Sequence, residues 1–275
     1  MNTKKKILIG SLVVVGFVVL SVASTAIYNG LFAWDTTYYD EQGFCNVQGV
    51  NIHGDIYTYV PTQGSAENPE EYQAQYGDAV GSEDVVAQLW NADRDDQIKA
   101  IMIEVDSLGG YPVAGEEISN AVKELTKPVV AVIRQSGLSA AYWAISGADK
   151  IFASRNSDVG SIGVTASYLE NVSKDTKYIQ LSSGKFKDTG SPDKPISEEE
   201  KNLLLRDIKI THENFIAEIS QNRKLPIEEV RAIADGSSVL GDRAKTLGLI
   251  DEIGSWTVAE KYLEETIGEK PEICW

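Results

Sequence analysis

The chain has 275 residues, of which 43% are hydrophobic, and this is enough apolar material for one substantial core or two small ones. It carries 41 Asp and Glu residues against 25 Lys and Arg, which gives a formal net charge of −16. This acidic balance argues against a nucleic-acid partner and against a polybasic surface that binds anionic lipid.

The first 28 residues predict a membrane anchor. Lysines 4–6 precede an uncharged stretch, 7–28, whose 22 residues would span roughly 33 Å as a helix, against about 30 Å for a bilayer core. The lysines place the N-terminus in the cytoplasm and the rest of the chain outside a single-pass cell membrane. The alternative is a cleaved signal peptide, because Ser24 and Ala26 offer small residues at positions −3 and −1. Both interpretations export the domain.

We expect four segments: an N-terminal transmembrane helix (1–28), a juxtamembrane linker (29–44), one domain (45–265) and a C-terminal tail (266–275). Cys45 and Cys274 lie near opposite ends of the exported part, where a disulfide is permitted, but the spacing equally allows free thiols. Two cysteines and two histidines, His53 and His212, are too few and too scattered to predict a zinc site.

The domain alternates between strand and helix patterns. A strand is expected from Val47 to Ile56, and the polar, glycine-containing stretch 61–81 predicts an exposed loop. Ser82 should cap a helix whose apolar residues 85, 86, 89 and 90 follow helical spacing. Further strands are expected at 98–105, 128–133, 150–153 and 178–181, and further helices at 113–125, 139–146, 197–222 and from Pro226. This alternation predicts an α/β fold with a largely parallel sheet.

Ser139 is the candidate nucleophile. It begins a helix of small residues, where backbone N–H groups and the helix dipole favour developing negative charge. A serine hydroxyl needs a base that removes its proton during attack. Considered alone, a serine at this position is more often a helix cap.

Two kinds of side chain could serve as this base, a histidine or a lysine. The segment Gly137-Leu-Ser139-Ala-Ala is similar to a nucleophile elbow with alanine replacing the last glycine, which would require His212 as base and an acid between the two. His212 lies on a mostly polar helix and is expected to face solvent. A lysine is the alternative, where burial lowers its pKa from about 10.4 towards neutrality. Lys187 and Lys185 both follow the expected strand at 178–181.

Gly109 and Gly110 supply a third element of such a site. They follow a buried strand and precede a helix, at a turn where exposed N–H groups can bind an oxyanion. A tight turn explains one glycine easily and two less well.

The order of these motifs resembles that of the signal peptide peptidase A (SppA) family of membrane-anchored serine proteases. The likeness extends from about Val47 to Leu263. Its motifs are the stretch 84–101, Asp106-Ser-Leu-Gly-Gly110, Lys127-Pro-Val-Val, the Ser139 segment, Ala148-Asp-Lys-Ile-Phe-Ala, Gly160-Ser-Ile-Gly-Val, Ser183-Gly-Lys-Phe-Lys187-Asp, Ala234-Asp-Gly and the stretch 244–251.

The resemblance implies a Clp-protease/crotonase-type fold and a serine endopeptidase with a Ser–Lys dyad. Ser139 would be the nucleophile and Lys187, rather than Lys185, the general base, with an oxyanion hole formed by the backbone of Gly109 and Ala140. It further implies a homo-oligomeric ring in which serine and lysine meet across subunits. Hydrophobic peptides would be the substrates, such as remnant signal peptides or fragments of membrane proteins. No metal or organic cofactor is implied.

The sequence departs from the family pattern at two places. Asp106-Ser-Leu-Gly-Gly replaces Asn-Ser-Pro-Gly-Gly, and Ser139-Ala-Ala-Tyr-Trp replaces Ser-Gly-Gly-Tyr-Tyr. The methyl groups of Ala140 and Ala141 are expected to narrow the cleft, but no catalytic group is lost.

Two other functions remain open. One is a catalytically silent, membrane-anchored ring scaffold or peptide-binding protein. The other is a crotonase-type acyl-CoA enzyme on the same fold, since fold does not fix function. The basic and apolar N-terminus argues against the acyl-CoA enzyme, which would be cytosolic.

Overall fold

The computed structural model describes residues 45–61, 68–170, 179 and 181–275. The predicted anchor and linker lie outside these residues, so the membrane topology stays a prediction. Among the helices that the structure describes, none is both long and apolar enough to cross a membrane. Residues Cys45–Trp275 form one compact unit.

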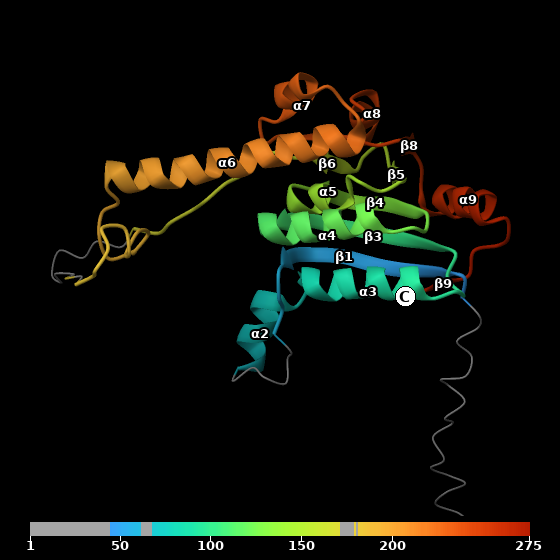
Figure 1. The fold of residues 1–275 in the computed structure, drawn as a ribbon, viewed down its shortest axis with the longest axis horizontal. Coiled ribbons are helices and arrows are strands. Elements are labelled where there is room, and N and C mark those ends of the chain that lie inside the picture. The colour runs from blue at the N-terminus through green and yellow to red at the C-terminus, as the bar shows by residue number, and fades with distance from the viewer. Residues whose placement is uncertain (1–44, 62–67, 171–178, 180) are drawn as a thin grey trace, which may run out of the picture. The chain divides into compact units, whose positions relative to one another are not determined.

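A largely parallel sheet lies at the centre of this unit, as the alternation of strands and helices predicted (Figure 1). Its main path runs in the order β2-β1-β3-β4-β5-β8, with β9 paired to β1 and β6 paired to β4. Only the β6–β7 pair is antiparallel among the described strands. The strands are β1 (Val47–Tyr57), β2 (Val80–Gly81), β3 (Ala100–Gly110), β4 (Val129–Leu138), β5 (Lys150–Ala153), β6 (Asp158–Gly160), β7 (Ser238–Leu240), β8 (Glu252–Ile253) and β9 (Ile273–Cys274).

Helices cover both faces of the sheet. The helices are α2 (Pro69–Tyr76), α3 (Ser82–Arg94), α4 (Pro112–Glu124), α5 (Ala140–Ile145), α6 (Glu198–Arg223), α7 (Ile227–Ile233), α8 (Gly241–Thr246) and α9 (Trp256–Ile267). Apolar side chains of α3, α4 and α5 bury one face, and those of α9 bury part of the other.

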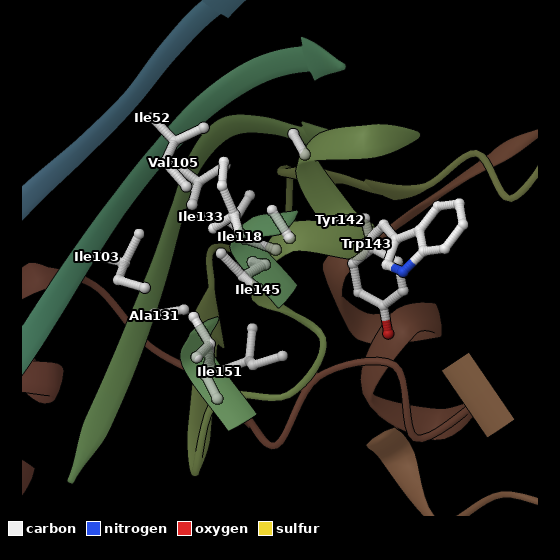
Figure 2. Close-up of a cluster of buried hydrophobic side chains, with 14 of the residues drawn as sticks. Ile52, Ile103, Val105, Ile118, Ala131, Ile133, Tyr142, Trp143, Ile145 and Ile151 are labelled. Atoms are coloured by element: carbon white, nitrogen blue, oxygen red, sulfur yellow. The ribbon is translucent and has the colours of Figure 1, made fainter. Parts of the chain in front are cut away.

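The core is built mainly from β-branched residues of the central strands. Figure 2 shows Ile52 of β1, Val105 of β3 and Ile133 of β4 on one face, where Ile118 of α4 and Ile145 of α5 pack against them. All five side chains are at most 2% exposed. This apolar packing is typical of parallel strands that lie between layers of helices.

Helix α6 is only half embedded in the unit. Its N-terminus has a capping box, in which Ser197 and Glu200 exchange hydrogen bonds with each other's backbone. Phe215, Ile216 and Ile219 in its C-terminal half are buried. Figure 1 shows the N-terminal half extending beyond the ends of the strands, together with the segment that precedes it.

Several predicted elements need correction. The stretch 61–81 is not simply a loop, because it contains α2, capped by Asn68, and β2. Ser82 does not cap α3: it lies inside the helix, and its hydroxyl donates a hydrogen bond to Glu117 instead. The strand predicted at 178–181 falls partly outside the described residues, and neither Ile179 nor Leu181 belongs to a strand.

The predicted C-terminal tail is part of the compact unit. Strand β9 pairs with the beginning of β1, and the Asn46 amide group bonds to the backbone at Lys270 and Glu272. Cys45 and Cys274 form a disulfide with their Cα atoms 5.8 Å apart, which decides the alternative that the sequence left open.

Reducing this disulfide should lower the stability of the domain markedly. The bond closes a loop with a sequence separation of 229 residues, and loss of so long a cross-link costs about 4 kcal/mol through the entropy of the unfolded chain. For a domain of this size we expect the melting temperature to fall by roughly 10 °C. The measurement is thermal unfolding with and without reductant. A Cys45→Ser/Cys274→Ser variant should melt at the lower temperature both with and without reductant. An equal melting temperature for reduced and oxidised wild type would contradict the expectation.

Candidate active site

Ser139 lies at the junction of β4 and α5 in a strained backbone conformation. Its φ of 52° and ψ of −127° are unusual for a residue with a side chain. Its N–H donates to the Gly160 carbonyl at 2.8 Å, and its carbonyl accepts the first bond of α5 from Trp143 at 2.9 Å. The side chain makes no capping hydrogen bond to the helix. A helix cap therefore does not account for this serine, and strain of this kind is characteristic of functional positions.

The glycine turn at the end of β3 lies directly against Ser139. Gly109 has a φ of +112°, and a Cβ there would lie 2.8 Å from the Cβ of Ser139. A Cβ on Gly110 would collide with the backbone of Ile56 in β1. Close contacts thus explain why glycine stands at each of the two positions. A tight turn alone explained one of the two glycines but not the other.

Ser107 holds this turn in place. It is 2% exposed, and its hydroxyl donates to the Gly54 carbonyl at 2.5 Å while accepting the Gly109 N–H at 3.0 Å. The register between β1 and β3 shifts beside Gly54, between His53 and Asp55. The Gly109 N–H, expected as an oxyanion donor, is consequently engaged within its own chain in this conformation.

The alanines after the nucleophile are accommodated by the neighbouring helix. A Cβ on Gly115 of α4 would lie 3.1 Å from the Ala140 methyl group, so the glycine leaves room for it. Ala141 is fully buried, and only Ala140 reaches the cavity beside Ser139. The expected narrowing of the cleft by Ala141 is therefore wrong.

A cavity of about 560 Å³ opens beside Ser139. Its lining comes from the glycine turn, the start of α5, the segment after β6, the middle of α6 and the segment after α7. The residues are Leu108, Gly110, Pro112, Ser139, Ala140, Trp143, Ser161, Gly163, Val164, Thr165, His212, Phe215, Ala234, Asp235 and Gly236. Ser139 and the glycine turn thus share one cavity, whose volume is within the range typical of ligand pockets.

Lys187 does not lie in this cavity within one chain. It is an exposed residue in a turn before α6, where its N–H bonds to the Gly184 carbonyl at 3.1 Å. Lys185 pairs with Glu199 at 2.7 Å. The structure therefore does not bring Ser139 and either lysine together within the described residues of one chain.

Lys194 connects the turn that carries Lys187 to the start of α6. Its amine lies 3.1 Å from a carboxylate oxygen of Asp188, the next residue after Lys187, and 2.7 Å from one of Glu200. Glu200 is 4% exposed. The hydrogen bond from Lys194, together with those from the Ser197 backbone and hydroxyl, lowers the pKa of Glu200 to about 2.

Glu200 should contribute to stability above pH 4.5 and lose that contribution in acid. Because its folded pKa is depressed from 4.5 to about 2, the stabilisation is complete above pH 4.5 and disappears as the pH falls towards 2. Melting temperatures of wild type and Glu200→Gln, measured by circular dichroism from pH 7 to 2, should differ most at neutral pH and converge near pH 2. Glu199→Gln is the matched control, since Glu199 is largely exposed, and its curve should follow wild type. A constant gap between wild type and Glu200→Gln would contradict the assignment.

The expectation that His212 faces solvent is wrong. It lines the cavity, and its Nε2 is buried without a hydrogen-bond partner among the described residues. Asp235 lines the same cavity, but its carboxylate accepts hydrogen bonds from the hydroxyl and N–H of Ser237, which lower its pKa. No hydrogen bond among the described residues links Ser139, His212 and Asp235 into a triad. His53 lies elsewhere, 3.0 Å from Glu104.

Sequence reasoning missed the aromatic wall of the cavity. Trp143 stacks on Phe215 with ring centroids 4.6 Å apart and an interplanar angle of 8°. The spacing of His212 and Phe215, three residues apart on one helix, would have indicated that both occupy the same face. Among the residues that the structure describes, no cluster of His, Cys, Asp and Glu is arranged to hold a metal ion.

Comparison with known proteins places the chain among peptidases. The sequence profile of peptidase family S49 matches residues 121–269, and that of Clp protease matches residues 73–159. The second match runs from before β2 through β5, and the chain has the Clp-protease-type α/β fold that the resemblance implied. A ClpP1 mutant from Listeria monocytogenes superimposes with a TM-score of 0.47 at 18% identity, covering 75% of this chain and 91% of that one.

Two of the relatives found by sequence show the extent of the similarity. A protein named as a protease in Methanocaldococcus jannaschii is 36% identical over 192 residues, which cover 67% of this chain and 62% of that protein. A protein from Enterococcus faecium named as signal peptide peptidase SppA is 30% identical over 177 residues, which cover 62% of this chain and 51% of that protein. The chain thus matches between half and two thirds of the length of these relatives.

Proposed function

The chain belongs to peptidase family S49, and from this premise we propose that it is a serine endopeptidase in which Ser139 is the nucleophile. The observation that carries the proposal is the strained Ser139 at the start of α5, which lies against a glycine turn and lines a cavity together with it. Such geometry exposes a hydroxyl beside backbone donors, as acyl transfer requires.

The proposed reaction is a two-step acyl transfer. Ser139 Oγ attacks the peptide carbonyl while the neutral amine of Lys187 takes the hydroxyl proton. The same amine then protonates the leaving nitrogen, and water hydrolyses the acyl-enzyme with Lys187 again accepting a proton. The tetrahedral oxyanion would accept hydrogen bonds from the Ala140 N–H and from the glycine turn.

The expectation that the Gly109 N–H is the second oxyanion donor needs to be refined. The Gly109 N–H already donates to Ser107 Oγ at 3.0 Å, so an oxyanion would have to share or displace that bond. Gly110 is the glycine of the turn that lines the cavity. We therefore propose the Gly109–Gly110 turn as a unit, rather than Gly109 alone, as the partner of Ala140.

A second subunit would supply the base. The segment around Lys187 and the outer half of α6 expose apolar side chains, among them Leu181 at 92%, Leu205 at 50% and Ile210 at 55%. Such exposed apolar groups support a protein–protein contact. We propose that this segment and the outer half of α6 pack on the next copy in a homo-oligomeric ring. Lys187 then lies beside the Ser139 of that next copy. Burial at the boundary favours the neutral form of a lysine amine.

The substrate class and location also belong to the proposal. We propose an enzyme anchored by residues 1–28 with its domain outside the membrane, which cleaves hydrophobic peptides such as remnant signal peptides or membrane-protein fragments. The apolar and aromatic wall of the cavity, with Trp143 and Phe215, supports an apolar peptide.

The test is covalent labelling of the full chain with a fluorophosphonate, read by intact mass and by cleavage of a fluorogenic apolar peptide. Wild type should be labelled once, at Ser139, and Ser139→Ala should lose labelling and on the order of 10⁴-fold or more in kcat/KM. An assembled wild-type protein that is neither labelled nor active would instead support the silent scaffold.

A further inference from the structure

The last part of β3 contains a β-bulge on the side that pairs with β1. The register between the two strands shifts after the pair formed by His53 and Asp106. From there to the pair formed by Asp55 and Gly109, β1 contributes one residue, Gly54, and β3 contributes two. A bulge changes the direction in which the backbone groups after it point, and bulges are frequent beside active sites. Here the glycine turn follows the bulge directly.

The Ser107 hydroxyl connects the two strands at this bulge. Ser107 is 2% exposed, and its hydroxyl donates to the Gly54 carbonyl at 2.5 Å and accepts the Gly109 N–H at 3.0 Å. The hydroxyl therefore holds the Gly109 N–H on the side of the turn that faces β1. Without the hydroxyl, two buried backbone groups would lose this partner, which costs free energy.

The next N–H group of the turn points to the other side. Gly110 is paired with Ile56, and the Ile56 carbonyl accepts the Tyr111 N–H at 2.9 Å. In such a parallel pair, one residue bonds through its own N–H and C=O, and the N–H of the other points away. Ile56 is the bonding residue, so the Gly110 N–H is directed away from β1. Gly110 also lines the cavity beside Ser139.

We propose that Ser107 is a positioning residue of the oxyanion hole; this rests on the proposed peptidase function. By binding the Gly109 N–H on the β1 side, its hydroxyl fixes the orientation of the turn in which the Gly110 N–H faces the cavity. The Gly110 and Ala140 N–H groups then hold the oxyanion. A donor that is fixed before the reaction needs no reorganisation when charge develops, so its placement affects the rate.

The first test compares Ser107→Ala and Ser107→Thr with wild type in the full chain, by cleavage of an apolar peptide. In Ser107→Ala, kcat should fall by about 30-fold, less than the roughly 10²- to 10³-fold that loss of a whole oxyanion donor costs. KM should change by less than about twofold, because the oxyanion forms only in the transition state. Ser107→Thr keeps the hydroxyl and should retain most of the wild-type kcat.

A peptide aldehyde probes the oxyanion hole directly. Its carbonyl carbon bonds to Ser139 Oγ, the serine proton passes to the base, and the aldehyde oxygen takes the oxyanion position. Ser107→Ala should bind the aldehyde about 30-fold more weakly than wild type, in step with the fall in kcat. It should bind the corresponding peptide alcohol as wild type does, because the alcohol has no carbonyl for Ser139 to attack.

Ser157→Ala is the matched control. Ser157 is 1% exposed, and its hydroxyl makes the same two kinds of bond, to the Arg134 carbonyl at 2.5 Å and from the Ser154 N–H at 3.0 Å. It does not line the cavity. Ser157→Ala and Ser107→Ala should therefore lower the melting temperature alike, while Ser157→Ala keeps the wild-type kcat.

Hydrogen exchange resolved by residue tests the geometry in wild type alone. The Gly109 N–H should exchange more slowly than the Gly110 N–H, and the reverse order would overturn the assignment even if Ser107→Ala failed to fold.

The outcomes separate this inference from the proposed function. A wild type that neither cleaves peptides nor binds the aldehyde would overturn both. An active wild type whose kcat is unchanged in Ser107→Ala, or falls equally in Ser157→Ala, would overturn only the role of Ser107. A rise in kcat would overturn it as well, because it would identify the Gly109 N–H as an oxyanion donor released from a competing bond.

Discussion

Replacing Lys187 by alanine should abolish peptide cleavage, and mixing that variant with Ser139→Ala should restore it. Loss of a general base costs about 10²- to 10⁴-fold in rate. Within one chain Lys187 is exposed and lies outside the cavity that holds Ser139. If neighbouring copies build each site together, a Lys187→Ala subunit still has its serine and can receive a lysine from a Ser139→Ala neighbour.

The fraction of activity that is recovered depends on how the two variants combine in the assembly. In a head-to-tail ring formed from equal amounts of the two variants at random, about a quarter of the sites would join an intact serine to an intact lysine. The measurement is the rate of peptide cleavage after the two inactive variants are unfolded and refolded together. Lys185→Ala is the matched control, because that lysine is two residues away and largely exposed, and it should keep wild-type activity. Mass measurement should first show that the mixture has assembled. A cleavage rate in that mixture no higher than the rates of the separate variants would then contradict a site shared between subunits.

Gly109→Ala should reduce kcat/KM by about 10²-fold, because displacing a reacting group by as little as 1 Å has effects of that size. A Cβ at this position would lie 2.8 Å from Ser139 Cβ and 3.1 Å from the Ala140 nitrogen. The methyl group would press on the nucleophile and on the proposed oxyanion donor together. The φ of +112° adds backbone strain for any residue other than glycine.

Gly268→Ala isolates the backbone strain from the steric effect. Gly268 ends α9 with a φ of +77°, and no atom lies within 4 Å of a Cβ built there. This control should lose about 1 kcal/mol of stability, as expected for alanine in the left-handed region, and keep full activity. Thermal unfolding and kcat/KM of both variants make the comparison. Full activity in Gly109→Ala would show that the Gly109–Gly110 turn takes no part in the reaction.

Periodicity predicted the buried half of the fold well. The β-branched runs that became β1, β3 and β4 and the amphipathic residues of α4 are recognisable because each side chain has one clear environment. The boundaries were less accurate: β3 and β4 extend to Gly110 and Leu138. Apart from Leu108 and Leu138, the extra residues are glycines and polar residues, whose strand conformation comes from pairing with neighbouring strands rather than from their own preference.

Contacts distant in sequence account for what was missed. The helix α2 has little apolar periodicity, and Tyr72 and Tyr76 hold it through contact with Tyr57 of β1 and the Pro61 carbonyl. Strand β9 is two residues long and exists through its pairing with β1. His212 was assigned to solvent from its polar neighbours in sequence, whereas α6 buries one narrow face against the cavity.

The candidate nucleophile and the glycine turn were recognisable because glycines and small residues are rare signals at a strand end. The separation of Lys187 from Ser139 within one chain was not recognisable from residue types, because an exposed lysine in a turn looks like any other lysine. The Ser107 hydroxyl that holds the glycine turn was equally hidden, since a serine near the end of a strand carries no distinctive pattern.

The disulfide between Cys45 and Cys274 also changes what a cut in the chain does. It encloses nearly all of the compact unit, so any single cleavage between the two cysteines produces two pieces that remain covalently attached. A peptidase is exposed to cleavage by its own copies, and here one nick releases no fragment. The nicked protein should migrate as one species on a non-reducing gel and as two after reduction, so damage to the backbone and loss of material are separate events.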